Sequence, residues 1–156
     1  MDSIRLEDLD GRCSLDIQEK CINAILSDSE FNLKRLILPI NSLCFQNASD
    51  ILLKMPMQRL IPIAADLLEW AQDLNWPGTK TVISIISKMP TNVVLDAFAK
   101  AKERAVNEND EEWIFNLNLL EESEYRASFI SETQGNGDPE LRKHILKELE
   151  ALTKKQ

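Results

Sequence analysis

A six-residue pattern occurs twice in this chain and narrows the folds that the chain can adopt. Residues 51–56 read Ile-Leu-Leu-Lys-Met-Pro, and residues 85–90 read Ile-Ile-Ser-Lys-Met-Pro, thirty-four positions later. Each copy ends one apolar run with helical spacing and precedes another, so the repeated unit is a helix, a proline turn and a helix. One such hairpin cannot bury its apolar face alone. The repeat therefore predicts stacked helical hairpins, either as an α-solenoid or as a compact bundle.

Helical spacing of apolar residues extends over most of the chain, and caps and prolines separate the runs. We predict an all-α fold of about seven helices, arranged as a HEAT-like, right-handed superhelix of hairpins. Residues 79–88 are rich in β-branched side chains and also resemble a strand, but one strand among helices would leave its backbone groups unpaired. Ser14 and Thr91 are the predicted N-caps of two helices. The predicted helices cover residues 15–26, 31–38, 43–55, 57–74, 79–88, 93–105 and 113–120, and a last helix begins at Asp138.

Length and composition predict one domain, because 156 residues with 44% hydrophobic content are enough for a single core. Residues 1–156 would form this domain, with an irregular N-terminus over 1–13 and a loop over 131–137. No apolar run approaches the ~20 residues that span a bilayer, and the acidic start does not resemble a secretory signal. We expect a cytoplasmic protein without membrane contact, whose three cysteines, Cys13, Cys21 and Cys44, are buried thiols.

The net charge of the chain indicates which classes of partner it can attract. Eighteen basic and 26 acidic side chains give a net charge of −8. This charge opposes the electrostatic attraction that drives nucleic-acid binding, so we expect no nucleic acid partner. An acidic surface can attract a basic protein, although acidic balance is also common among soluble proteins.

Residues that would mark catalysis are scarce. The single histidine, His144, has no Cys or Ser near it in sequence, and no glycine-rich phosphate loop or nucleophile elbow occurs. The acidic runs 110–112 and 121–122 could supply an acid and a base or a Mg²⁺ site, yet such runs are usually solvated faces or helix N-termini. We therefore predict no catalytic residue, no metal site and no cofactor, with a small carboxylate- or metal-dependent enzyme as the alternative.

Three tryptophans near predicted helix joins are the candidate binding residues. Asp73 and Asn75 lie beside two of them, and Trp next to Asp and Asn on a rigid joint is typical of an interaction hot spot. A structural role is the interpretation that we favour, since most large aromatic residues near helix ends serve packing. In that case Asn75 takes a left-handed position, Asp73 accepts bonds from backbone N–H groups of the next helix, and Trp76 packs over the turn. The predicted set is Trp70, Asp73, Asn75, Trp76 and Trp113.

Residues 67–77 read Leu-Leu-Glu-Trp-Ala-Gln-Asp-Leu-Asn-Trp-Pro. This stretch resembles the Leu-Leu-Glu-Trp-Leu-Gln-Asp-Met-Asn-Trp-Pro signature of DUF5071, a bacterial domain family of unknown function. Residues 110–114 and 44–48 are similar to two weaker blocks of that family. Ala71 and Gly78 depart from its pattern, which has Leu and Val there. The resemblance covers about residues 44–130 and implies an all-helical, HEAT-like fold without an established activity.

From these observations we expect a non-catalytic protein-interaction module. Small acidic proteins of such folds often serve as immunity partners of bacterial toxins, and by this analogy the partner would be a basic toxin domain. The identity of the partner and the oligomeric state are not predicted.

Overall fold

The structure, a computed structural model, describes residues 4–131, and every regular element in this range is helical. This confirms the all-α prediction, and residues 79–88 form a helix rather than a strand. The α-helices are α1 Leu15–Ser27, α2 Phe45–Leu53, α3 Met57–Leu60, α4 Ala64–Leu67, α5 Thr79–Ser87, α6 Thr91–Asn107, α7 Glu111–Glu121 and α8 Ser123–Ser131. The 3-10 helices are η1 Leu6–Leu9, η2 Leu33–Leu36, η3 Ser42–Cys44, η4 Ile61–Ile63 and η5 Leu68–Gln72.

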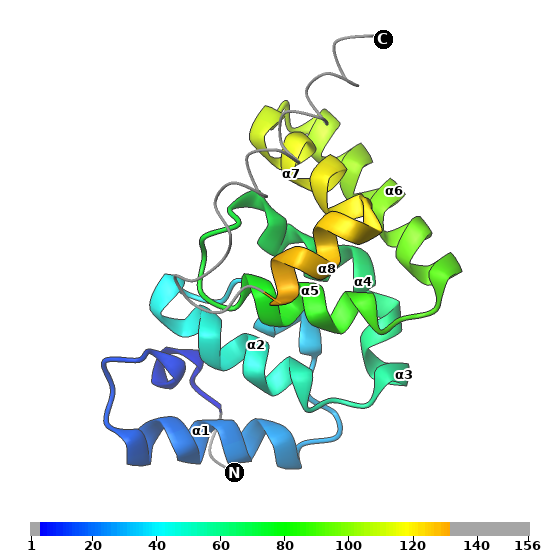
Figure 1. Cartoon of the computed structure of the whole chain (residues 1–156). Helices are drawn as coiled ribbons and strands as arrows, with labels where there is room; N and C mark the ends of the chain where they lie inside the picture. Colours follow the sequence, from blue (N-terminus) through cyan, green and yellow to red (C-terminus); the bar gives the residue numbers. More distant parts are fainter. Residues whose placement is uncertain (1–3, 132–156) are drawn as a thin grey trace, which may run out of the picture.

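The helices pack in two neighbouring series. In the first, α1 packs on α2, α2 on α5 and α5 on α8, so these four follow one another up the molecule in Figure 1. In the second, α4 packs on α6 and α6 on α7. One hydrophobic core connects the two series, from Leu6 in the N-terminal turn to Phe129 in α8. No helix among the described residues is long and apolar enough to cross a membrane.

The two Lys-Met-Pro joins of the sequence repeat have the same backbone shape. Lys54 and Lys88 end α2 and α5 with ψ angles of −4° and −6°, and the following Pro56 and Pro90 have ψ angles of 140° and 144°. The methionine between them is buried in both copies. Proline cannot continue the preceding helix, but it is tolerated at the start of the next. The repeated six-residue pattern therefore forms the same kind of helix-to-helix turn at both places.

The helix that follows the first join is broken, whereas the one that follows the second is continuous. Residues 57–72 form α3, η4, α4 and η5 in succession, so the prediction of one helix over 57–74 is wrong. Pro62 lies inside this stretch, lacks the N–H that a helix needs there, and its ring crowds the preceding turn. If residues 57–72 are counted as one bent rod, the described residues contain seven rods with α-helix, apart from the short 3-10 helices η1–η3.

The structure confirms one of the two predicted N-caps. The Ser14 hydroxyl accepts a hydrogen bond from the backbone N–H of Ile17, 3.3 Å away, and α1 begins there. Thr91 is not a cap, because it is already the first helical residue of α6 and Pro90 occupies the cap position. Asp110 was not predicted as a cap, but its carboxylate accepts the N–H of Trp113 at 3.0 Å and begins α7.

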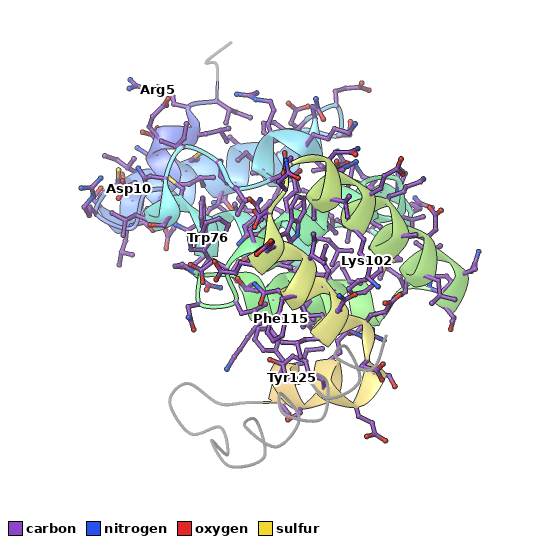
Figure 2. The ribbon with its side chains drawn as sticks, turned by 90° about the horizontal axis from the view of Figure 1, so that it is seen from above. Arg5, Asp10, Trp76, Lys102, Phe115 and Tyr125 are labelled. Atoms are coloured by element: carbon purple, nitrogen blue, oxygen red, sulfur yellow. The ribbon has the colours of Figure 1, made fainter. Side chains whose placement is uncertain are left out.

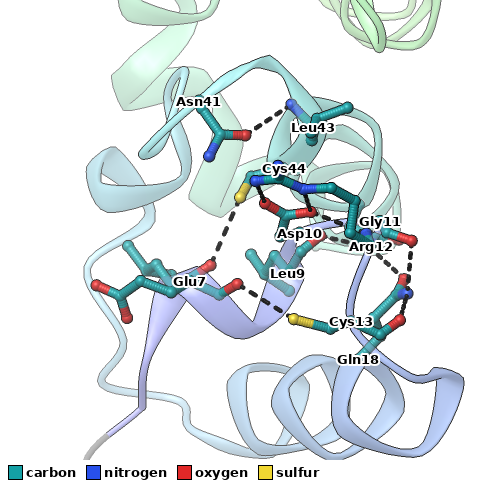
Figure 3. A network of polar contacts seen from close by, with 12 residues as sticks. Glu7, Leu9, Asp10, Gly11, Arg12, Cys13, Gln18, Asn41, Leu43 and Cys44 are labelled. Atoms are coloured by element: carbon teal, nitrogen blue, oxygen red, sulfur yellow. Dashed lines mark hydrogen bonds and ion pairs between the residues drawn. The ribbon is translucent and has the colours of Figure 1, made fainter.

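The N-terminal segment is more ordered than predicted. Residues 1–13 were expected to be irregular, but residues 6–9 form η1, and Leu6 and Leu9 are buried in the core. The three thiols bind to this turn. Cys21 donates to the backbone carbonyl of residue 5 at 3.4 Å. Cys44 and Cys13 donate to the carbonyls of residues 6 and 7, at 3.8 and 3.7 Å (Figure 3). Cys21 and Cys44 are buried as predicted, and Cys13 is partly exposed.

The other end of the described chain also differs from prediction. Residues 123–131 form α8, which was not predicted, and its Tyr125 and Phe129 are buried. Ser131 is the last residue of α8, and the rest of the predicted loop 131–137 lies outside the described residues. The helix expected from Asp138, and His144 within it, also lie outside them.

Candidate functional site

The three tryptophans occupy different environments. Trp70 and Trp113 are fully buried, and their indole N–H groups donate to the backbone carbonyls of Pro77 and Leu68, at 3.0 and 3.1 Å. Trp76 is half-buried and lies between the N-terminal elements, where Asp10 is labelled, and α7, where Phe115 is labelled (Figure 2). Trp70 and Trp113 therefore support the site from inside, and Trp76 is the tryptophan that a ligand can reach.

Residues 73–78 form the turn between η5 and α5, and internal hydrogen bonds fix its shape. The buried Thr79 hydroxyl donates to the carbonyls of Trp76 and Asp73, at 2.9 and 3.2 Å. The Asp73 carboxylate accepts the N–H of Asn75 at 2.8 Å. This bond lies within the turn, so the expectation that Asp73 bonds to the next helix is wrong. The side chain of Asn75 points into solvent.

The left-handed residue of this turn is Gly78 and not Asn75. Gly78 has a φ of 89°, whereas Asn75 is absent from the residues with positive φ. A Cβ atom at position 78 would lie 2.6 Å from the Ser49 hydroxyl oxygen and 2.9 Å from the carbonyl oxygen of Phe45. Only glycine fits both the backbone conformation and this close approach to α2. The turn is thereby pressed against the first turn of α2.

Aromatic contacts and α7 complete the support. The ring of Phe45 on α2 packs edge-on against both Trp70 and Trp76, with centroids 5.9 and 5.4 Å apart. From α7, the buried Asn116 amide donates to the carbonyl of Ala71 at 2.9 Å. Sequence reasoning missed Asn116, although its position three residues after Trp113 places it on the buried face of α7. Groups from α2 and α5 thus hold the turn in place, and α7 holds η5, the segment that leads into it.

An open groove of about 510 Å³ runs beside this turn, between the start of α2 and the start of α5. Of the predicted site residues, Asn75 and Trp76 line it, Asp73 adjoins it, and Trp70 and Trp113 lie beneath the surface. Sequence reasoning did not find the contributions of α2 and α5, because these helices reach the turn only through the tertiary fold. The groove is lined by Gln46, Leu74, Asn75, Trp76, Pro77, Gly78, Lys80 and Thr81.

A second groove of about 500 Å³ lies between η4–α4 and α6, and its charges largely pair with one another. Arg104 contacts Asp66 at 2.9 Å and Glu69 at 3.8 Å, and Lys100 contacts Asp96 at 2.9 Å. Burial raises the pKa of Glu69, while the charge of Arg104 opposes this shift. The Arg104 pairs join α4 and η5 to α6, whereas the Lys100–Asp96 pair lies within α6.

The acidic runs 110–112 and 121–122, which could have supplied catalytic carboxylates, contain residues with different structural roles. Asp110 caps α7, and Glu121 pairs with Lys102 of α6. Within residues 4–131, no three His, Cys, Asp or Glu side chains converge as a metal site requires.

Comparison with known proteins bears on the whole site. The family model described as a domain of unknown function, DUF5071, matches residues 45–155. The chain belongs to the DUF5071 family. The DUF5071 match begins at the first residue of α2 and includes the 73–78 turn, both joins and α7, whereas α1 and η1–η3 precede it. It also extends past residue 130, where the resemblance in sequence ended. No curated protein and no solved structure matches the chain.

Proposed function

We propose that this DUF5071 protein is a non-catalytic protein-interaction module and that the 73–78 turn contacts its partner. One observation carries the proposal. Trp70 of η5, Thr79 of α5 and Phe45 of α2 all contact the turn and fix its shape. The turn nevertheless presents Asn75, Trp76 and Pro77 at the surface. A surface that is already rigid loses little conformational entropy on binding, which is why preorganised turns make effective binding sites. A half-buried tryptophan is also the residue type most enriched at binding hot spots.

The finer architecture that we propose is a HEAT-like, right-handed superhelix. The equal backbone angles of the two Lys-Met-Pro joins and the packing of α2 on α5 and α5 on α8 support it. Stacked hairpins of this kind commonly use extended surfaces to bind other proteins.

The partner that we propose is a basic protein in the bacterial cytoplasm. In the sharper form of this hypothesis, the partner is a toxin domain that this protein binds and masks. The support is the net charge of −8. A small carboxylate- or metal-dependent enzyme remains the alternative function. Calorimetric titration with Mg²⁺, Mn²⁺ and Ca²⁺ tests it, since tight binding would favour that alternative over the interaction module.

Capture of the partner from native cells tests the main proposal. The immobilised full chain should retain one protein at near-equal stoichiometry. Asn75→Ala and Trp76→Ala should each reduce its recovery at least fivefold, whereas Asn23→Ala and Leu95→Ala, at exposed positions on α1 and α6, should not. Recovery of no stoichiometric partner, or of one that all four variants retain equally, would overturn the proposal.

A further inference from the structure

We infer that the groove beside the 73–78 turn binds an extended, basic peptide segment of the partner. This inference rests on the proposed function and specifies the chemistry of the bound group. It follows from three properties of the groove: its unused hydrogen-bonding groups, its apolar wall and the carboxylates at its margins.

The unused polar groups match those of a peptide backbone. Among the described residues, the Asn75 side-chain amide and the Trp76 indole N–H have no hydrogen-bond partner, and neither is buried. The Gln46 amide donates to Asp50 at 2.9 Å, which leaves its carbonyl oxygen available as an acceptor. An extended segment offers backbone N–H and C=O groups in alternation, and these pair with such a mixed set of donors and acceptors.

The apolar wall suits a long aliphatic side chain, a flat side chain or a proline ring. Leu74, Trp76 and Pro77 follow one another along the groove. Their rigid surfaces present little conformational freedom that binding would remove. The stem of an arginine or lysine packs well on such a surface, and a guanidinium group stacks favourably on an indole. The volume of about 510 Å³ falls within the roughly 300–1,000 Å³ typical of ligand sites.

The charges at the margins favour a basic occupant. Asp50 adjoins Gln46 at one margin and Asp73 adjoins Leu74 at the other. One oxygen of each carboxylate accepts an internal hydrogen bond, and the second oxygen is unused among the described residues. The lining contains the cation Lys80, whose ammonium group lies 6.0 Å from the ring centroid of Phe129 on α8. Two carboxylates against this one cation give the groove and its margins a net negative charge, which can attract a positively charged side chain.

A selection with random peptides tests the inference without knowledge of the partner. Phage-displayed random dodecapeptides are selected on the immobilised full chain, and the enriched sequences are synthesised with both ends capped. We expect sequences with Arg or Lys next to Pro or an aliphatic residue. Binding should weaken as salt concentration rises. Enrichment of acidic or uncharged sequences, or no enrichment, would overturn the inference.

Variants then locate the binding peptide. The double variant Asp50→Asn with Asp73→Asn keeps both hydrogen-bond acceptors and removes both charges, and it should weaken binding about tenfold. Asp16→Asn with Asp96→Asn removes the same charge at exposed, distant positions and should leave affinity within about twofold. In ¹⁵N spectra the indole signal of Trp76 should shift on peptide addition. The indole of Trp113 is bonded to the backbone carbonyl of Leu68, which does not line the groove, and should not shift.

These experiments separate failure of the inference from failure of the proposed function. If basic peptides bind but the Trp76 signal and the double variant show no response, net charge alone attracts them and the inference is wrong. If no peptide is selected while Asn75→Ala still releases the captured partner, the turn contacts a folded surface. The proposed function then stands and the inference fails. If substitutions in the turn do not change recovery of the partner, the proposed function itself fails.

Discussion

The indole nitrogen of Trp113 donates a hydrogen bond to the backbone carbonyl of Leu68, 3.1 Å away and 45 residues distant in the sequence. Leu68 begins η5, the last part of the bent rod, and Trp113 lies in the first turn of α7. Both residues are buried, so water cannot replace the bond. This contact ties α7 to η5, the element that leads into the 73–78 turn.

Replacement of Trp113 by Phe should therefore destabilise the fold. The variant leaves the Leu68 carbonyl buried without a donor and opens a small cavity, at a cost of about 2–4 kcal/mol. Urea denaturation measures the change. Trp76→Phe is the control, because the Trp76 indole N–H bonds to no described residue, and it should cost less than about 1 kcal/mol. Equal losses in the two variants would contradict the importance of the buried bond.

Gly78→Ala should lower the free energy of unfolding by about 2–4 kcal/mol. A positive φ is unfavourable for alanine, and the new Cβ would press on the backbone carbonyl of Phe45 at 2.9 Å. Gly11→Ala is the matched control, since its Cβ would lie 3.6 Å from the nearest described atom and its φ is not positive. That variant should be neutral or stabilise by up to about 1 kcal/mol. Thermal unfolding of both proteins decides the comparison.

Asp10 should make the N-terminal segment sensitive to acid. Arg12 bonds to its carboxylate through the side chain at 2.7 Å and through the backbone N–H at 2.8 Å, and these bonds hold the pKa of Asp10 well below its usual value. The folded state therefore favours the ionised form. The resulting stability is present above about pH 4, the ordinary aspartate value, and is lost as the pH falls below it.

The variant Asp10→Asn checks this sign. It should be less stable than the parent chain at pH 7, and the difference should shrink as the pH falls from about 4 toward 2. Asp16→Asn is the control, because Asp16 is exposed and only pairs with Lys20 on the surface of α1. A stability difference for Asp10→Asn that stays constant across this pH range would show that the carboxylate charge contributes nothing.

The cysteines should react with iodoacetamide in a defined order. Cys13 is partly exposed, whereas Cys21 and Cys44 are buried, and burial raises the pKa of Cys21 to about 11 and also raises that of Cys44. Because the thiolate is the reactive form, Cys13 should be alkylated first at pH 8 in the native chain. Peptide mass spectrometry follows each site. In urea the three rates should converge, and similar rates in the native chain would mean that residues 4–44 do not stay folded on α2.

The helical fold could be predicted from the sequence because its signals are local. Ser14 needs only the next three residues to act as a cap, and proline after Lys-Met ends a helix wherever the pattern occurs. The break at Pro62 was equally local, and the apolar stripe through residues 57–74 concealed it. The 3-10 turn over residues 6–9 was missed for another reason. It is stabilised by thiols and apolar residues that are distant in sequence, which periodicity does not report.

The candidate site was predicted in part. The tryptophans, Asp73 and Asn75 drew attention through residue type, and Asn75 and Trp76 do line the groove. Residue type does not distinguish a tryptophan that donates to a buried carbonyl from one that faces solvent. Trp70 and Trp113 were therefore grouped with Trp76. Asn116 and Gly78 act through contacts across more than one helix, and only the tertiary structure reveals them.

Contacts from α2 and α5 hold the turn at residues 73–78, and a contact from α7 holds η5, which leads into it. Phe45 comes before the turn, Thr79 follows at once, and Asn116 reaches the carbonyl of Ala71 only when α7 docks. A chain in which α7 has not docked carries every residue of the turn but lacks the bond that fixes the segment before it. A partner that recognises the turn would then bind fully folded copies of the protein in preference to partly folded ones.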